Sequence, residues 1–166
     1  MRYIMTLVSL FAADSGIKHY IEKHVAQGTE KPILGGKCCI RKHHNTGAML
    51  HLGGNRAGLV AALSLVFSAF MSGIFAAALT VKGNAVLKSA LAMLLGGAYS
   101  NTYDRLKRHY VVDYVSFRFP PVKNRLLGKL KNALEAVVFN LSDFGIIIGA
   151  MLIMVRELFR SDKKAS

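Results

Sequence analysis

Two aspartates are the residues of this chain best placed to do chemistry together. Asp143 interrupts the apolar run from Val137 to Val155, and Asp113 lies in the preceding polar connection, within Tyr110-Val111-Val112-Asp113-Tyr114. A carboxylate inside a membrane segment is costly and is a functional candidate by default. Two acids brought together at a membrane surface predict acid–base chemistry.

The run around Asp143 is apolar enough to insert into a bilayer despite its acid. Its eleven Val, Leu, Ile and Phe residues contribute roughly −0.3 to −0.6 kcal/mol each at a helix centre, about −3 to −7 kcal/mol together. One central Asp costs about 2.5 to 3.5 kcal/mol, and Asp143 lies nearer one end. The balance therefore favours insertion.

Hydrophobic residues, 52% of the 166, are concentrated in blocks that predict four transmembrane helices at 3–20, 57–81, 85–103 and 137–156. The second block has 25 residues without a charge, more than the ~20 that cross a bilayer as a helix. Lys82-Gly83-Asn84 predicts a tight turn, which makes the second and third helices antiparallel neighbours.

The first apolar segment follows Met1-Arg2 and so resembles a cleavable secretory signal. Asp14 and Lys18 at its far end stand four apart with the acid first, the favourable order for a pair on a helix. We therefore favour an uncleaved first membrane helix, in which this pair supports a small sheet at the membrane surface.

The connection from 24 to 56 predicts a small sheet at the membrane surface. Between Gly35-Gly36 and Gly53-Gly54 lie Cys38–Ile40 and Ala48–Leu52, short runs typical of strands. A disulfide between the adjacent Cys38 and Cys39 would be strained. We interpret both as small apolar residues of a strand.

The connection from 104 to 136 is interrupted by Pro120-Pro121, which stops any helix there. Beyond it, leucines and basic residues alternate at helical spacing, as in a basic amphipathic helix on a membrane surface. They are Leu126, Leu127, Leu130 and Leu134, among Lys123, Arg125, Lys129 and Lys131. This helix is either a lid that steers anionic lipid or substrate towards the acids, or an inert extension of the last span.

An even number of spans places the first and third connections on one side of the membrane. Asn45, Asp104, Arg105 and Asp113 then share a face with the Asp143 end of the last helix. Fifteen of the 22 Lys and Arg residues lie in or beside these two connections, so the positive-inside rule would place the acids in the cytoplasm.

The net charge of +13 indicates which classes of partner to expect. Basic residues next to apolar spans favour anionic lipid headgroups, and no nucleic-acid motif accompanies them. His43, His44 and His51 match no metal-ligand spacing. We expect no metal, no cofactor and no nucleic acid.

Further polar residues are spaced to support the acids. Asn140 and Asp143 lie three apart, which predicts one face of one helix, and Asn101 and Asp104 repeat that spacing. Arg105 is either a clamp for substrate or lipid oxygens, or the ion-pair partner of Asp104. Gly145 and Gly149, four apart, predict close packing against a neighbouring helix.

Taken in order, the polar residues form five blocks: Asp14…Lys18, Asn45-Thr46-Gly47-Ala48, Gly96-Gly97…Asn101-x-x-Asp104-Arg105, Val111-Val112-Asp113-Tyr114 and Phe139-Asn140-x-x-Asp143. This series, which covers nearly the whole chain, resembles the lipoprotein signal peptidases, the signal peptidase II family of bacteria. The blocks around the two acids are the specific part of the resemblance.

The resemblance implies an aspartic endopeptidase of the bacterial plasma membrane. Such enzymes remove signal peptides from prolipoproteins, cutting before a diacylglyceryl-modified cysteine at the extracytoplasmic face. The matching acids, Asp113 and Asp143, would form the catalytic dyad. Residues that would bind substrate or support the dyad are Asn45, Gly47, Asn101, Asp104, Arg105, Asn140, Asp14 and Lys18.

The expected fold is an all-α membrane protein with one domain, 1–166, made of four transmembrane helices, a small extracytoplasmic β-sheet and a surface amphipathic helix. We expect a monomer whose partners are lipid-modified prolipoproteins and anionic membrane lipids. In the reaction, one carboxylate would take a proton from water while the other acid donates one to the developing oxyanion.

The chain departs from the family pattern at several positions. Ser100 replaces a usual glycine, Ser15 replaces a frequent glutamine, and Met49-Leu50 replaces Ala-Phe. The two acids stand thirty positions apart, about ten more than expected, because of the insertion at 118–136. These departures predict a divergent member or a paralogue, and they bear on substrate preference before they bear on activity.

Structural or non-catalytic alternatives exist for these functional interpretations. Asp143 could be a structural acid paired with Arg105, and Asp104 could act in structure or in catalysis. The whole chain could be a small transporter with a proton relay, although acids clustered at one face do not suit a relay. It could also be a non-cutting relative that binds lipoproteins.

Overall fold

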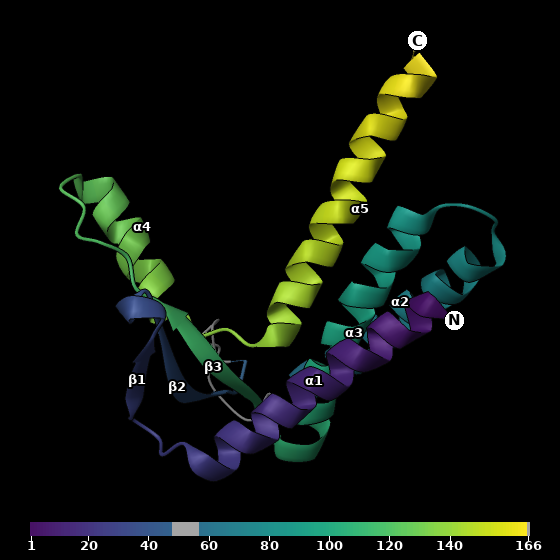
Figure 1. The fold of residues 1–166 in the computed structure, drawn as a ribbon. Coiled ribbons are helices and arrows are strands. Elements are labelled where there is room, and N and C mark those ends of the chain that lie inside the picture. Colours follow the sequence, from purple (N-terminus) through teal and green to yellow (C-terminus); the bar gives the residue numbers. More distant parts are fainter. Residues whose placement is uncertain (48–56, 166) are drawn as a thin grey trace.

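The computed structural model describes residues 1–47 and 57–165. They form five α-helices and one small sheet (Figure 1). The helices are α1 (Arg2–His24), α2 (Ala57–Thr80), α3 (Ala85–Arg108), α4 (Arg125–Ala136) and α5 (Leu141–Ala165). The strands are β1 (Glu30–Ile33), β2 (Cys38–Asn45) and β3 (Val111–Phe117), and a short 3-10 helix, Leu34–Gly36, joins β1 to β2.

The four long helices predicted from the apolar segments are all present. In the described part of the chain, α2 is the one helix that is both long and apolar enough to cross a membrane. Membrane crossing by α1, α3 and α5 stays a prediction. The predicted turn is also present, with Gly83 and Asn84 both at positive φ.

Four predicted helix boundaries were wrong, and two of these are the ends of α1 and α5, which extend to His24 rather than 20 and to Ala165 rather than 156. α3 does not end at 103 but continues through Asp104 and Arg105 to Arg108, and His109 ends it in the left-handed conformation. The last helix begins at Leu141 rather than at 137. The preceding residues are extended, because the Phe139 backbone hydrogen-bonds to Val115 of β3 in both directions, at 2.7 and 2.8 Å.

α3 lies in the middle of the helices and packs against α1, α2 and α5. Glycines permit this close approach. A Cβ atom at Gly149 would lie 2.6 Å from the carbonyl oxygen of Ala90 in α3, and one at Gly145 would clash with Leu10 of α1. The close packing predicted for Gly145 and Gly149 is confirmed.

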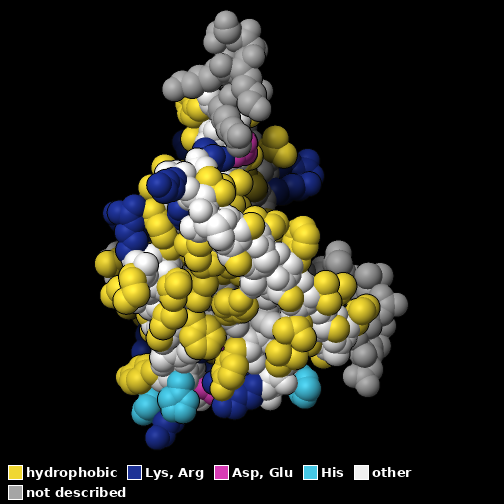
Figure 2. Space-filling view, turned by 90° about the vertical axis from the view of Figure 1, so that its right-hand side faces the viewer, with side chains coloured by type: hydrophobic (Ala, Val, Ile, Leu, Met, Phe, Trp, Pro, Cys, Tyr) yellow, Lys and Arg dark blue, Asp and Glu magenta, His cyan; other side chains and the backbone are white. Residues whose placement is uncertain are grey.

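The outer faces of α1 and α2 are apolar. Figure 2 shows a broad hydrophobic surface across the middle of one side of the molecule, with most Lys, Arg and His side chains nearer its margins. The large exposed side chains of these helices include Ile4, Met5 and Val8 of α1, and Leu63, Phe67 and Phe70 of α2. Exposed apolar area of this extent needs a non-aqueous partner.

The sheet is antiparallel with strand order β1-β2-β3. Sequence reasoning located only the start of β2, at Cys38–Ile40, and missed β1 and β3; the predicted strand Ala48–Leu52 lies outside the described residues. Ile40 pairs with Val115 and His43 pairs with Asp113, so β2 bulges between them. Bulges bend a strand and re-aim side chains next to functional sites.

Candidate active site

Asp113 lies on the buried central part of β3, with 2% of its surface exposed. Its Oδ2 accepts a hydrogen bond of 3.0 Å from the side-chain amide of Asn45, at the end of β2. Its Oδ1 accepts one of 2.6 Å from the side-chain amide of Asn140. Two amide donors therefore fix the orientation of this carboxyl group.

Gly47 fixes Asn45 in turn. The Gly47 backbone N–H donates to Asn45 Oδ1 at 2.9 Å, so the amide of Asn45 must present its NH₂ group to Asp113. Gly47 has a φ of 77°, and a Cβ atom there would lie 3.2 Å from Val60 of α2. Both the backbone conformation and the space favour glycine at this position.

Asp143 lies in the first turn of α5 and forms a reciprocal cap with Asn140. The Asp143 backbone N–H donates to Asn140 Oδ1 at 2.9 Å, and the Asn140 backbone N–H donates to Asp143 Oδ2 at 3.0 Å. This is the geometry of a capping box. The prediction that Asn140 and Asp143 share one face of a helix was wrong, because Asn140 precedes the helix.

Asn140 therefore connects the two acids directly. Its side-chain NH₂ group binds Asp113 while its backbone binds Asp143. The same NH₂ group also donates to Asn101 Oδ1 at 3.2 Å, and Asn101 donates to Asp143 Oδ1 at 3.0 Å. The acids, thirty positions apart in sequence, are brought to one site by β3, α3 and the start of α5.

The two roles of Asn140 can be separated by substitution. Asn140→Ala removes both the cap and the NH₂ donor, so we expect a loss of about 1 kcal/mol in stability together with most of the activity. Asn140→Asp keeps a capping oxygen but replaces the donor to Asp113, so we expect it to be folded and inactive. Thermal unfolding and turnover of the two variants should be compared; full activity of Asn140→Asp would contradict this role.

Lys18 stabilises the site from behind. It is 1% exposed, and its Nζ lies 2.7 Å from Asp14 and 3.5 Å from Asp104. Nζ also donates to Asn101 Oδ1 at 2.7 Å. Since Asn101 Oδ1 faces this cation, its NH₂ group must face Asp143.

Asp14 joins three elements beneath the two acids. It accepts hydrogen bonds from Ser100 Oγ of α3 at 2.6 Å and from Ser142 Oγ of α5 at 2.5 Å. It also accepts one of 2.9 Å from the Tyr114 hydroxyl and one of 3.1 Å from the Leu141 backbone N–H. Burial and the charge of Asp14 raise the pKa of Tyr114, so Tyr114 remains a neutral donor.

Sequence reasoning missed the roles of Tyr114 and Ser142. A signal was available, because successive side chains of a strand point to opposite faces. If Asp113 faces the site, Tyr114 must face α1. Ser15 and Ser100, two departures from the family pattern, lie with their Oγ atoms 3.5 Å apart beside Asp14.

The contacts of Asp104 favour a structural role over a catalytic one. Its carboxylate accepts a hydrogen bond of 3.2 Å from the Val112 backbone N–H, and it lies 3.4 Å from Arg108 and 3.5 Å from Lys18. Within the described residues, Arg105 forms no ion pair with either Asp104 or Asp143. The predicted pairing of Arg105 with Asp104 was therefore wrong.

A cavity of about 430 Å³ opens beside Asp143, between α2, α3 and α5. Its polar lining includes Asn101, Arg105 and Asp143, and its apolar lining from α3 and α5 includes Ala98 and Ile146. The buried Nε of Arg105 has no hydrogen-bond partner among the described residues. The side chains from α2 that line the cavity are Val60, Leu63, Ser64, Phe67 and Ser68.

The surroundings of Asp113 favour its protonated form. Burial, together with the charge of Asp143, raises the pKa of Asp113 to about 7, against the hydrogen bonds from Asn45 and Asn140, which lower it. Close carboxyl groups of this kind share a proton and titrate as a pair. The site can therefore hold one ionised acid and one proton donor near neutral pH.

The histidines lie outside this arrangement. His44 stacks on Tyr110 with ring centroids 4.0 Å apart and lies 2.9 Å from Glu22 of α1. His43 pairs with Asp113 in the β-ladder, and burial lowers the pKa of its imidazole. Among the described residues, no group of His, Cys, Asp and Glu is arranged to hold a metal ion; His51 lies outside them.

The fold and the site together place two coupled carboxyl groups beside a partly apolar cavity, in a protein whose α1 and α2 have apolar outer faces. The model of the family described as signal peptidase (SPase) II matches residues 6–159. The chain therefore belongs to the signal peptidase II family.

Individual relatives agree with this family. The chain is 31% identical over 170 residues to a lipoprotein signal peptidase of Bacillus subtilis (strain 168), covering 99% of this chain and 97% of the relative. Two solved structures described as bacterial membrane enzymes, at 21% and 20% identity, superpose with TM-scores of 0.77. They cover 95% and 98% of this chain, and 92% and 91% of theirs, which establishes the fold.

Proposed function

We propose that this protein cleaves signal peptides from bacterial prolipoproteins as an aspartic endopeptidase, with Asp113 and Asp143 as its catalytic acids. The observation that carries the proposal is the bridge by Asn140, which holds both acids at one site in a chain of the signal peptidase II family. Two coupled carboxyl groups supply the base and the acid that peptide hydrolysis needs without a metal.

In the proposed reaction, the ionised carboxylate removes a proton from a water molecule as that water attacks the scissile carbonyl carbon. The protonated acid donates to the carbonyl oxygen as negative charge develops there. Collapse of the tetrahedral species then breaks the C–N bond: the leaving amine takes the proton that the first carboxylate removed from water, and the second acid recovers a proton from a hydroxyl group of the tetrahedral species. Because the acids titrate as a pair, the roles belong to the pair rather than to one residue.

The cavity between α2, α3 and α5 suits a substrate with an apolar part and a polar part. We propose that the diacylglyceryl-modified cysteine region enters there. Arg105 lines the cavity, its buried Nε has no hydrogen-bond partner among the described residues, and its guanidinium can donate two parallel hydrogen bonds to ester or peptide carbonyl oxygens. The apolar side chains of α2 then lie against the acyl chains or the signal peptide.

The proposal is tested with the full chain in lipid and a prolipoprotein bearing the diacylglyceryl group. The same prolipoprotein without that group is the matched control, and mass spectrometry of both products locates the broken bond. We expect cleavage immediately before the modified cysteine and at least tenfold slower cleavage of the control. Binding without cleavage would instead support the alternative of a non-cutting relative. Equal cleavage of both substrates would show that the diacylglyceryl group is not required.

A pH dependence follows from the raised pKa of Asp113, about 7. Above this value the pair loses its remaining proton and with it the acid that protonates the substrate. We therefore expect kcat/KM, which reports the free enzyme, to fall about tenfold per pH unit above neutrality. Asn45→Ala removes a hydrogen bond that lowers this pKa, so its alkaline limb should move to higher pH; a flat profile to pH 9 would contradict the mechanism.

We further propose that α1, α2, α3 and α5 all cross the plasma membrane, with the sheet at the extracytoplasmic face and the multi-pass chain acting as a monomer. The apolar outer faces of α1 and α2 support this arrangement. Reporter fusions after Ala165 should be active only for cytoplasmic reporters. An active periplasmic reporter at that position would reverse the orientation.

A further inference from the structure

We propose that α4 is an interfacial arm whose leucine face lies in the headgroup region of an anionic bilayer and whose C-terminal end is fixed to the sheet that carries Asp113. This inference concerns how the chain sits on its membrane. It does not depend on peptidase activity, and its test uses no substrate.

The apolar face of α4 is exposed. Leu126, Leu130, Leu127 and Leu134 are 75%, 57%, 51% and 41% exposed. The half-buried residues of the helix are Gly128, Lys131 and Glu135, and the last two form an ion pair of 3.2 Å. A helix on a soluble protein has the opposite arrangement, so the leucines must meet an apolar phase.

The C-terminal end of α4 is attached firmly to the sheet. Arg41 of β2 donates from Nη2 to the carbonyl oxygens of Glu135 and Ala136, at 3.2 and 3.1 Å. A cation at this end of a helix is favourable because the last carbonyls are otherwise unpaired. Glu135 also accepts a hydrogen bond of 2.7 Å from the Phe119 backbone N–H.

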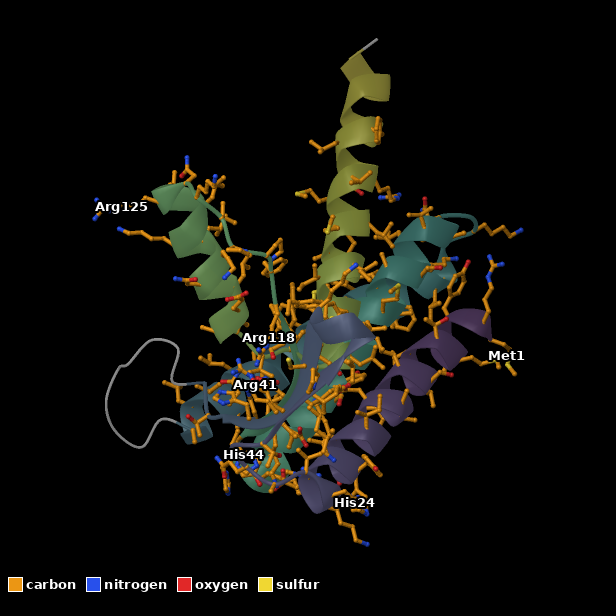
Figure 3. The ribbon with its side chains drawn as sticks, turned by 60° about the vertical axis from the view of Figure 1, so that its left-hand side comes forward. Met1, His24, Arg41, His44, Arg118 and Arg125 are labelled. Carbon is orange, nitrogen blue, oxygen red and sulfur yellow. The ribbon has the colours of Figure 1, made fainter. Side chains whose placement is uncertain are left out.

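Attachment at one end leaves the rest of the helix projecting from the molecule. Figure 3 shows Arg41 and Arg118 at the base of α4 and Arg125 at its far end. In Figure 1, α4 stands apart from the ribbon of α5. No residue of α4 is buried.

The basic residues near the leucine face of α4 favour an anionic bilayer over a second copy of the chain as its partner. Lys123, Arg125 and Lys129 are exposed, and among the described residues none of them forms a salt bridge. A second copy of the chain, also at +13, would bring the same cations and repel them. Each basic residue near the surface raises the affinity for an anionic bilayer roughly fivefold. Because the chain belongs to a family of membrane enzymes, a bilayer is already present beside the molecule.

The test places a fluorescent probe on each side of α4. Leu130→Cys lies on the apolar face, and Asn132→Cys, on the polar side of the same helix, is the matched control. Native Cys38 and Cys39 are buried, and unsubstituted protein checks that they do not react. Each full-length variant is labelled with an environment-sensitive dye in phosphatidylcholine vesicles, with or without phosphatidylglycerol, and nitroxide-bearing lipids are added as quenchers.

We expect blue-shifted emission and lipid quenching at position 130 with phosphatidylglycerol, and much less at position 132. Replacing Lys123, Arg125 and Lys129 by Gln should lower the docking equilibrium by about a hundredfold, three steps of roughly fivefold, with thermal unfolding unchanged. Equal quenching at both positions, or none at 130 in a folded protein, would overturn the proposal. A concentration-dependent blue shift without lipid quenching would assign the face to a second copy instead.

Discussion

Asp113→Asn is expected to abolish cleavage while leaving the protein at least as stable as the wild type. The substitution keeps the shape of the side chain but removes the proton-transferring group. General acid–base catalysis is worth about 10² to 10⁴-fold, and loss of either acid should remove the whole of it. Asp143→Asn should have the same effect, because the acids act as one pair.

Stability should respond in the opposite direction to activity. The pKa of Asp113 is about 7 in the folded protein, against about 3.9 in an unfolded chain. Between these values the folded state holds a proton that the unfolded state has released, so the free energy of unfolding decreases as pH rises from about 4 to 7. Asn carries no charge, so Asp113→Asn should melt no lower than the wild type at pH 8.

A matched acid outside the site provides the control. Glu22 of α1 bonds to His44 and Tyr110, so Glu22→Gln should retain cleavage. Turnover of the modified prolipoprotein and thermal unfolding are measured for both variants. Residual cleavage by Asp113→Asn above one tenth of the wild-type rate would show that the catalytic residues are wrongly assigned.

Lys18→Met is expected to damage both folding and activity. It leaves the buried Asp14 without its cation, and breaking a buried ion pair in this way costs about 3–5 kcal/mol. It also removes the donor that holds Asn101 Oδ1, so the Asn101 amide can reverse and stop donating to Asp143. Thermal unfolding and turnover measure the two effects.

The double variant Asp14→Asn, Lys18→Met separates these effects. With both charges removed, most of the lost stability should return, whereas Asn101 still lacks its orienting contact. We expect kcat to remain about a hundredfold low, the scale of a small misplacement in a site, with KM little changed. Full recovery of kcat would limit Lys18 to a structural role.

The sequence predicted the parts of this molecule that follow from local pattern. Apolar length located the four long helices, and the leucine spacing located α4. The predicted meeting of Asn45 and Asp113 with the start of the last helix is present, although the even number of membrane spans from which it was argued stays a prediction. Residue types and order were sufficient for this, because helices are set by local hydrogen bonding and apolar periodicity.

The details that depend on distant pairing could not be predicted. β1 and β3 form strands because they pair with β2, and Asn140 leaves the helix because Phe139 hydrogen-bonds to β3. Helix propensity alone extends the last helix back to 137. Likewise, the choice of Lys18 rather than Arg105 as the partner of Asp104 depends on how α1 packs against α3.

The contacts of Asp14 also determine how much of the chain must be synthesised before the site can form. Asp14 is made in the first helix, but two of its partners, Leu141 and Ser142, are made more than a hundred residues later. Asp113 likewise lacks its hydrogen bond from the Asn140 side chain until Asn140 has been synthesised. The two acids therefore cannot be held together until the start of α5 has been synthesised, so the nascent chain lacks this assembled site until Asn140, Leu141 and Ser142 are in place.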